Sequence, residues 1–305
     1  MISFIVRRLG LAIITVLGVL TIVFALQRLS GDPTNLLLPV DASPELRQEF
    51  RHQLGLDQPL PIQYVRFLEE LTQGNLGRSF VHKQPALDIV FDRLPYTLVL
   101  AAVSLLMAIV LSLPLGILAA VYRDSWFDTL ATGFSLIGQA TPVYWLGLLF
   151  ILLFSVELQW FPSRGAGSWV SLILPATTLA VFSMARITRI TRSAVLEVLK
   201  ADYVNTARSK GVREGVVLTK HVLRNAAIPI VTMIGLQFGG LLSGTVLTET
   251  VFSRPGIGRL IVDSVYNRDF PVVQAVTFVV AVGFSLINLI VDLAYAALNP
   301  KIRLD

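Results

Sequence analysis

Residues 94–122 of the chain are LPYTLVLAAVSLLMAIVLSLPLGILAAVY, a run of 29 residues without a charged side chain. A helix that crosses the roughly 30 Å hydrocarbon core of a bilayer needs about 20 predominantly apolar residues. Five more uncharged runs have comparable length, at residues 9–27, 129–156, 165–185, 225–248 and 270–291. The sequence therefore predicts an all-α membrane protein with six transmembrane helices.

The composition agrees with a membrane protein and excludes several other classes. Of the 305 residues, 54% are hydrophobic and 15% are charged, whereas a soluble domain carries about 25% charged residues. The same numbers exclude a disordered chain. There is no cysteine, which excludes disulfide scaffolds, thiolate zinc sites and cysteine nucleophiles.

The distribution of Lys and Arg predicts the orientation in the membrane. Nine basic residues lie between Arg186 and Arg224, and short basic loops face the cytoplasm. Of the two short loops on the opposite side, one holds Arg164 and the other holds Arg254, Arg259 and Arg268. This bias predicts that both termini are cytoplasmic, and it explains the net charge of +5 without nucleic-acid binding. The first run, which follows Arg7 and Arg8, is expected to be an uncleaved anchor because no small-x-small cleavage site follows it.

These runs predict the organisation of the chain: a first transmembrane helix (1–29), a periplasmic insertion (30–95), a five-helix core (96–298) with a cytoplasmic loop (186–225), and a cytoplasmic tail (299–305). In the insertion, Ser43-Pro44 predicts the start of a short helix that Gly55 ends. A second helix is predicted over 61–71. The insertion is either a lid over the helix ends or a docking surface for an extracytoplasmic partner.

The cytoplasmic loop is too polar to span a membrane, and its pattern predicts two helices. The first is predicted over 191–204 and the second over 214–223, with a break at Gly211. Such a pair is suited to docking a cytosolic motor. The alternative is a basic loop with no partner.

Sequence motifs for chemistry are missing. No lysine is followed by Ser or Thr, so there is no phosphate-binding P-loop. Gly256-Ile257-Gly258 lacks the third glycine of a dinucleotide loop, and neither His-Glu-x-x-His nor Gly-x-Ser-x-Gly occurs. We therefore predict no catalytic, cofactor-binding or metal site in this chain. The energy for any transport has to come from an ion gradient or from a partner chain.

Three groups of residues in or beside the predicted spans stand out: a polar stripe, a set of glycines and a set of prolines. Asp292 forms one helical stripe with Asn288, Tyr295 and Asn299, and we interpret it as a structural anchor at the cytoplasmic end of the last span. The fifth run carries glycines that either permit tight helix packing or form a smooth pathway wall; they are Gly235, Gly239, Gly240 and Gly244. Each of four consecutive runs also contains a proline that can kink its helix; these are Pro114, Pro142, Pro175 and Pro229.

Several motifs together resemble one transporter family. The run DYVNTARSKG at 202–211, followed by HVLRN at 221–225, resembles the cytoplasmic coupling loop of ABC importer permeases, and more narrowly the B-type permease of the dipeptide/oligopeptide/nickel class. The motifs LGLDQP at 54–59, GNLGRS at 74–79, ETVF at 249–252 with PGIG at 255–258, and NPKIR at 299–303 agree. The loop departs from the general importer pattern at Asn205, Thr206, His221 and Arg224, in the manner of the peptide subclass.

This resemblance implies a type I ABC importer permease fold in a bacterial inner membrane. The implied partners are a homologous second permease, two cytosolic ABC ATPases that bind ATP and Mg, and a periplasmic or lipid-anchored substrate-binding protein. The chain would form half of the pathway for di- or oligopeptides, with nickel chelates, glutathione or opines as open alternatives. The implied ATPase-coupling residues are Asp202, Tyr203, Ala207, Arg208, Gly211, His221, Arg224 and Asn225.

Within that docking region, we expect Ala207 to sit where a large side chain does not fit, in a groove of the ATPase. Two other classes compete with this hypothesis. An ion-coupled secondary transporter needs ionisable groups at the membrane midplane, and an intramembrane enzyme needs paired carboxylates, a Ser/Lys pair or metal ligands inside the spans. Neither pattern is present in the six runs.

Overall fold

The computed structural model describes residues 2–298 except 30–33, 35–37, 39–41 and 54. Within these residues every extended regular element is a helix, and one isolated bridge joins Arg78 to Pro85. The helices are α1 (Ile2–Leu29), α3 (Pro44–Gln53), α4 (Leu60–Thr72), α5 (Ala86–Val121), α6 (Trp126–Ala140), α7 (Val143–Phe150), η1 (Ile151–Glu157), α8 (Val170–Leu199), α9 (Asp202–Ser209), α10 (Glu214–Val216), η2 (Val217–Leu223), α11 (Arg224–Val251), α12 (Ile257–Tyr266) and α13 (Phe270–Leu298).

The chain divides into two compact units. Unit 1 contains Met1–Val6, Pro95–Arg259 and Phe284–Asp305, and unit 2 contains Arg7–Leu94 and Leu260–Gly283.

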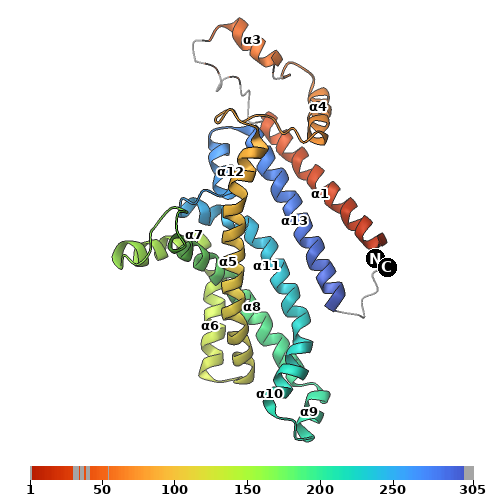
Figure 1. The fold of residues 1–305 in the computed structure, drawn as a ribbon, viewed down its shortest axis with the longest axis vertical. Coiled ribbons are helices and arrows are strands. Elements are labelled where there is room, and N and C mark those ends of the chain that lie inside the picture. The colour runs from red at the N-terminus through yellow and green to blue at the C-terminus, as the bar shows by residue number, and fades with distance from the viewer. Residues whose placement is uncertain (1, 30–33, 35–37, 39–41, 54, 299–305) are drawn as a thin grey trace. The chain divides into compact units, whose positions relative to one another are not determined.

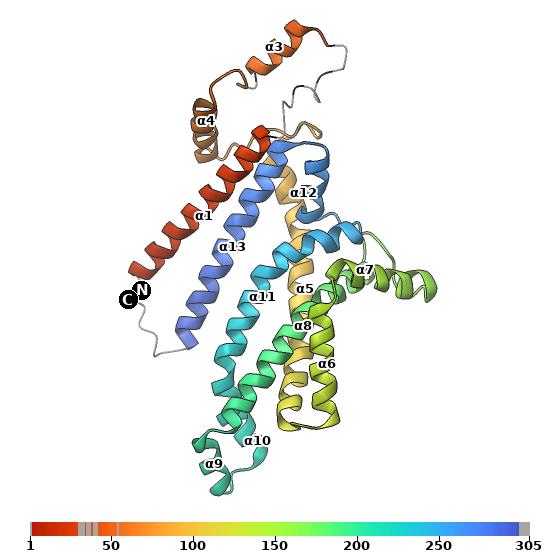
Figure 2. The same cartoon turned by 180° about the vertical axis from the view of Figure 1, so that it is seen from behind.

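Helix α8 is the centre of unit 1. In its most apolar stretch 67% of residues are buried, against 28% in the corresponding stretch of α5. Helices α6 and α11 pack directly against α8, and Figures 1 and 2 show them beside it together with α5. Small residues permit the close approach: a Cβ on Gly116 of α5 would lie 2.7 Å from the side chain of Thr191, and one on Gly138 of α6 would lie 3.1 Å from Ala185.

The number of spans agrees with the sequence when the third, a bent pair of helices, is counted as one span. Five described helices are long and apolar enough to cross a membrane. The predicted run at 129–156 forms α6 and the α7–η1 helix, which meet at 105°. The bend lies where Pro142 follows Thr141, because proline forces the preceding residue out of the helical region; Thr141 has ψ 124°. By contrast, Pro114, Pro175 and Pro229 lie inside continuous helices.

The predicted helix over 191–204 is wrong in one respect. Helix α8 ends at Leu199, and α9 begins at Asp202 after Ala201 adopts an extended conformation with ψ 143°. Neither glycine nor proline marks this break, so the helical periodicity alone could not locate it.

Unit 2 joins the insertion to the ends of α1 and α13. Phe24 of α1 packs against Tyr64 and Phe67 of α4, with ring centroids 5.3 and 5.6 Å away. The buried carboxylate of Asp269, just before α13, accepts hydrogen bonds from Ser79 Oγ at 2.5 Å and from the backbone N–H of Phe80 at 3.0 Å. The sequence predicted both helices of the insertion to within about two residues, and Gly55 ends α3 with φ +65°.

Candidate functional site

The short helix α9 is anchored by its inner face in a hydrophobic cluster. Val204 is fully buried and Ala207 is 8% exposed. They pack among apolar residues of four other helices, which are Ala120 of α5, Ala194 and Val195 of α8, Val217 and Val222 of η2, and Ala226 and Ile230 of α11. A rigid-body movement of α9 would therefore displace the ends of α8 and α11, since closely packed interiors transmit strain.

The outer face of α9 carries three of the eight predicted coupling residues. Asp202, Tyr203 and Arg208 are exposed, and Tyr203 leaves 46% of its surface uncovered. Ala207, in contrast, contacts this chain's own cluster. The neighbours of Ala207 belong to this chain, and its predicted place in a groove of the ATPase stays a prediction.

Gly211 ends α9 in a geometry that favours glycine. Its φ is +73°, a conformation that a β-carbon disfavours. The N–H of Gly211 donates to the carbonyl of Arg208 at 2.9 Å, and the N–H of Val212 donates to that of Ala207 at 3.2 Å. This is a Schellman motif, and its customary apolar contact is present because Val212 packs on the same cluster as Ala207.

An ion pair connects α9 to the start of α10, across the turn at Gly211. Arg208 donates from Nη2 to Glu214 Oε1 at 2.6 Å and from Nε to Oε2 at 3.2 Å. The Glu214 carboxylate raises the pKa of the Arg208 guanidinium through these hydrogen bonds. Further along, Arg224 and Asn225 are exposed, while His221 is half-buried and its carbonyl accepts a hydrogen bond from Asn225 Nδ2 at 2.7 Å.

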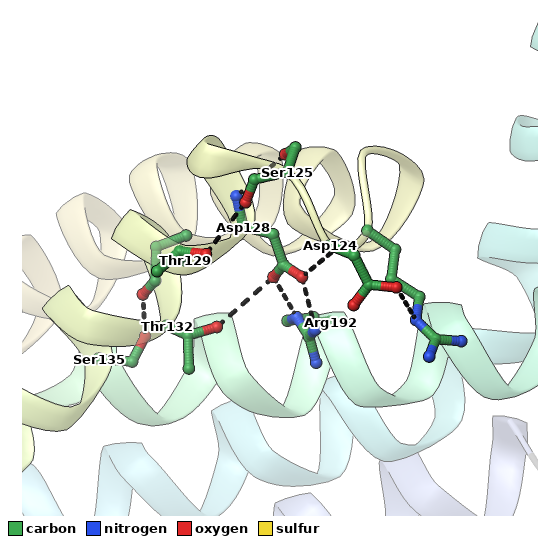
Figure 3. A network of polar contacts seen from close by, with 9 residues as sticks. Asp124, Ser125, Asp128, Thr129, Thr132, Ser135 and Arg192 are labelled. Carbon is green, nitrogen blue, oxygen red and sulfur yellow. Dashed lines mark hydrogen bonds and ion pairs between the residues drawn. The ribbon is translucent and has the colours of Figure 1, made fainter.

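A buried ion pair ties α6 to α8 near the same end of unit 1. Asp128 Oδ1 accepts from Arg192 Nε at 2.5 Å, and Oδ2 accepts from Nη2 at 2.7 Å. Figure 3 shows the Asp128 carboxylate between Arg192 and the turn that precedes α6. The N–H of Asp124 also donates to Oδ2 at 3.0 Å, and the N–H of Asp128 donates to Ser125 Oγ at 3.3 Å. Arg192 lies seven residues before the end of α8, so this pair joins α6 to the helix that leads into α9.

A second buried carboxylate explains the motif at 249–258. Glu249 is 0% exposed, and its Oε2 accepts from the N–H groups of Gly258 at 2.8 Å and Arg259 at 3.1 Å. Thr97 of α5 donates to Oε1 at 2.6 Å and accepts from the N–H of Ile257 at 2.9 Å. Glu249 thus supplies a side-chain acceptor to the first turn of α12, whose N–H groups have no partner within the helix.

The glycines of α11 differ in their surroundings. A Cβ on Gly235 would lie 2.6 Å from Val291, and one on Gly239 would lie 3.0 Å from Phe284, both on α13. Gly244 faces Leu179 at 3.5 Å, and Gly240 has nothing within 4 Å. Tight packing therefore accounts for Gly235 and Gly239, while Gly240 has open space beside it.

The polar stripe of α13 is described only in part. Asn288 is half-buried, and so is Asp292; Asn299 and the side chain of Tyr295 lie outside the described residues. On α8, Arg186 donates to Gln237 Oε1 at 3.3 Å and stacks over Phe182 at 4.4 Å. The anchoring role of Asp292 stays a prediction. Among the described residues, no group of three or more His, Asp or Glu side chains is placed to hold a metal ion.

Comparison with known sequences identifies the family. A sequence profile described as "Binding-protein-dependent transport system inner membrane component" matches residues 112–304, and the profile of the corresponding N-terminal region matches residues 1–101. The chain belongs to this family. It is the permease subunit of an ABC importer and a multi-pass protein of the inner membrane.

Individual relatives agree with this placement of the permease. It is 44% identical over 304 residues to the glutathione transport system permease protein GsiC of Pectobacterium atrosepticum, and 45% identical over 304 residues to that of Escherichia coli O6:H1. Each alignment covers 99% of both chains.

Solved structures place the fold. An inward-facing MetNI methionine ABC transporter has a TM-score of 0.58 at 20% identity, covering 69% of this chain and 96% of the other. An amino acid ABC transporter crystallised with histidines has a TM-score of 0.54 at 16% identity, covering 69% and 94%. The permease therefore has the type I importer fold.

The sequence pointed to α9 but missed two features. The Asp128–Arg192 pair joins residues 64 positions apart, and the Glu249–Thr97 hydrogen bond joins residues 152 positions apart. Asp128 and Glu249 each lie at the end of an uncharged run, and Glu249 also begins the motif at 249–252. Neither signal names a partner for the carboxylate.

Proposed function

We propose that this permease imports short peptides of about the size of glutathione, and that ATP hydrolysis in partner subunits drives the import through α9. The identity of 44% over 99% of the chain to permeases named for glutathione transport carries the substrate proposal. Glutathione is a tripeptide, so this proposal stays within the peptide class implied by the coupling loop. Nickel chelates and opines are the competing substrates.

The proposed assembly contains a homologous second permease, two cytosolic ATPases that hold ATP and Mg, and an extracytoplasmic binding protein. The exposed face of α9 supports docking to an ATPase, because Asp202, Tyr203 and Arg208 are uncovered while the opposite face is fixed in the hydrophobic cluster. Movement of the docked ATPase would shift α9 as a unit, since the Schellman turn at Gly211 and the Arg208–Glu214 pair hold its C-terminal end.

From α9 the movement has two routes into the spans. Val204 and Ala207 contact the ends of α8 and α11 through the cluster, and Asp128 couples α8 to α6 through Arg192. This arrangement supports a switch between inward- and outward-facing pathways in which α6, α8, α9 and the start of α11 move together. Gly240, which has open space beside it, is the glycine of α11 that we assign to the pathway wall.

The substrate proposal is tested by uptake into vesicles that contain the complete importer. Labelled glutathione, a dipeptide, a nickel–histidine chelate and an opine are offered separately with ATP. We expect uptake of glutathione or the dipeptide and none of the other two. Uptake of only the nickel chelate or only the opine would contradict the proposal, and the binding protein's own affinity for each compound is measured in parallel as a control.

A further inference from the structure

A cavity lies in unit 1 at the end opposite to α9. It has a volume of about 340 Å³ and is lined by residues of α5, of the start of α8 and of the turn after α11. Its wall comprises Pro95, Tyr96 and Val99 of α5, residues 166–168, Trp169, Leu172 of α8, and Arg254. We call this cavity the Arg254 pocket. Its volume lies at the lower end of the roughly 300–1,000 Å³ typical of small-molecule sites.

Arg254 is an unusual residue to find in this wall. It is 4% exposed, and its Nε and Nη1 atoms are buried without a hydrogen-bond partner among the described residues. A buried charge without a partner is costly, so buried arginines are normally paired. The backbone fixes Arg254 in place, because its N–H donates to the carbonyl of Glu249 at 2.8 Å.

The nearby carboxylate does not take up these guanidinium donors. Glu249 attracts Arg254 electrostatically, but its two oxygens are already bound by Thr97 Oγ1 and by the N–H groups of Gly258 and Arg259. The first turn of α12 is therefore satisfied, while Arg254 retains unused donors beside the cavity.

The lining defines the chemistry of a ligand. The guanidinium demands an anion, and a carboxylate forms strong charge-assisted hydrogen bonds with arginine. An apolar group next to that carboxylate would be covered by Val99, Leu172 and the partly exposed rings of Tyr96 and Trp169. An inorganic anion has no such apolar group. Resting on the proposed function, we propose that the Arg254 pocket binds the carboxylate end of a short peptide, with Arg254 as its anchor.

Direct binding tests this proposal without relying on transport. The transporter is purified with its partner permease and ATPases but without the binding protein, and binding of radiolabelled N-acetyl-Ala-Ala-Phe is measured by equilibrium dialysis. The same peptide with a C-terminal amide is the matched ligand. We expect the free acid to bind at least about tenfold more tightly than the amide, because hydrogen bonds to a charged group are lost in the amide.

Three variants locate the effect. Arg254→Gln is expected to abolish the preference for the acid, and Arg254→Lys is expected to retain part of it because the charge remains. Arg164→Gln, which changes an exposed arginine of the preceding loop, should leave the preference unchanged. Equal binding of acid and amide to the wild type would overturn the proposal, and so would an unchanged preference in Arg254→Gln.

The alternative partner of Arg254 is a carboxylate of the second permease, and the same variants test it. If Arg254 pairs with a carboxylate of the second permease, Arg254→Gln would weaken co-purification of the two permeases, and the wild type would show no acid preference. That result overturns the proposed ligand. Uptake by the complete importer separates the proposed ligand of the Arg254 pocket from the proposed substrate of the importer. If peptides are taken up but the purified transporter binds acid and amide equally, only the proposed ligand of the pocket is contradicted. If the acid binds more tightly but no peptide is taken up, only the proposed substrate is contradicted.

Discussion

The ion pair between α6 and α8 allows a quantitative prediction for Asp128→Asn. The Asp128 side chain is 6% exposed and that of Arg192 is 28% exposed. The substitution keeps the shape but removes the charge that two Arg192 nitrogens contact. Removing one partner of a fully buried pair costs about 3–5 kcal/mol, and hydrogen bonds to charged groups contribute about 1.5–3 kcal/mol. Because Arg192 keeps some exposure, we expect a loss of about 2–3 kcal/mol.

The loss is measured as a decrease in the thermal unfolding midpoint of the purified importer. For a chain of 305 residues, 1 kcal/mol corresponds to about 1.5 °C, so we expect Tm to fall by roughly 3–5 °C. Arg192→Gln should give a similar decrease. The double variant should be little worse than either single variant, because each single change already breaks the pair.

The neighbouring Asp124 supplies the matched control. It also pairs with an arginine, Arg123, at 3.1 Å, but its side chain is 78% exposed. Asp124→Asn should therefore change stability by no more than about 0.5 kcal/mol. If Asp128→Asn and Asp124→Asn unfold at the same temperature, or if the effects of Asp128→Asn and Arg192→Gln simply add, the pair does not couple α6 to α8 and the reasoning fails.

Three further predictions concern other parts of the permease. Gly256→Ala should destabilise the fold by about 1–3 kcal/mol in thermal unfolding, because its Cβ would overlap the Glu249 carboxylate; wild-type stability would contradict the capping account. Tyr203→Ala should lower peptide transport per ATP hydrolysed while leaving Tm unchanged, since the side chain is exposed; normal coupling would remove Tyr203 from the ATPase contact. A cysteine at Ser43 should react with an impermeant maleimide from outside intact spheroplasts, and one at Ser209 only after the membrane is opened; the reverse pattern would overturn the predicted topology.

The sequence predicted those features that depend on local physical chemistry. Uncharged runs located the spans because charge inside a bilayer is costly. Ser43 and Gly55 marked the ends of α3 because a side-chain oxygen caps the first turn and glycine tolerates positive φ; the N–H of Leu46 donates to Ser43 Oγ at 3.2 Å. Gly211 likewise ended α9 with φ +73°.

Features that depend on tertiary packing were not accessible from one sequence. The span that contains Pro142 is bent by 105°, whereas Pro114 and Pro175 lie inside continuous helices. In a membrane, neighbouring helices and side chains can satisfy the backbone groups that a proline frees, and a single sequence does not show where they do so. Arg254 counted only as a loop charge in the orientation argument. Its burial follows from the turn after α11, which no periodicity in the sequence predicts.

The central claim is that ATP, acting through partner subunits, drives peptide import by this permease. The most direct test measures uptake of labelled glutathione and of a dipeptide into vesicles containing the complete importer and its binding protein. ATP is supplied at the face that carries α9, and the pH gradient and membrane potential are both collapsed. Our account predicts uptake that requires ATP and the binding protein and is unaffected by an imposed proton gradient. No uptake with ATP, together with uptake restored by a proton gradient, would contradict it and favour an ion-coupled carrier.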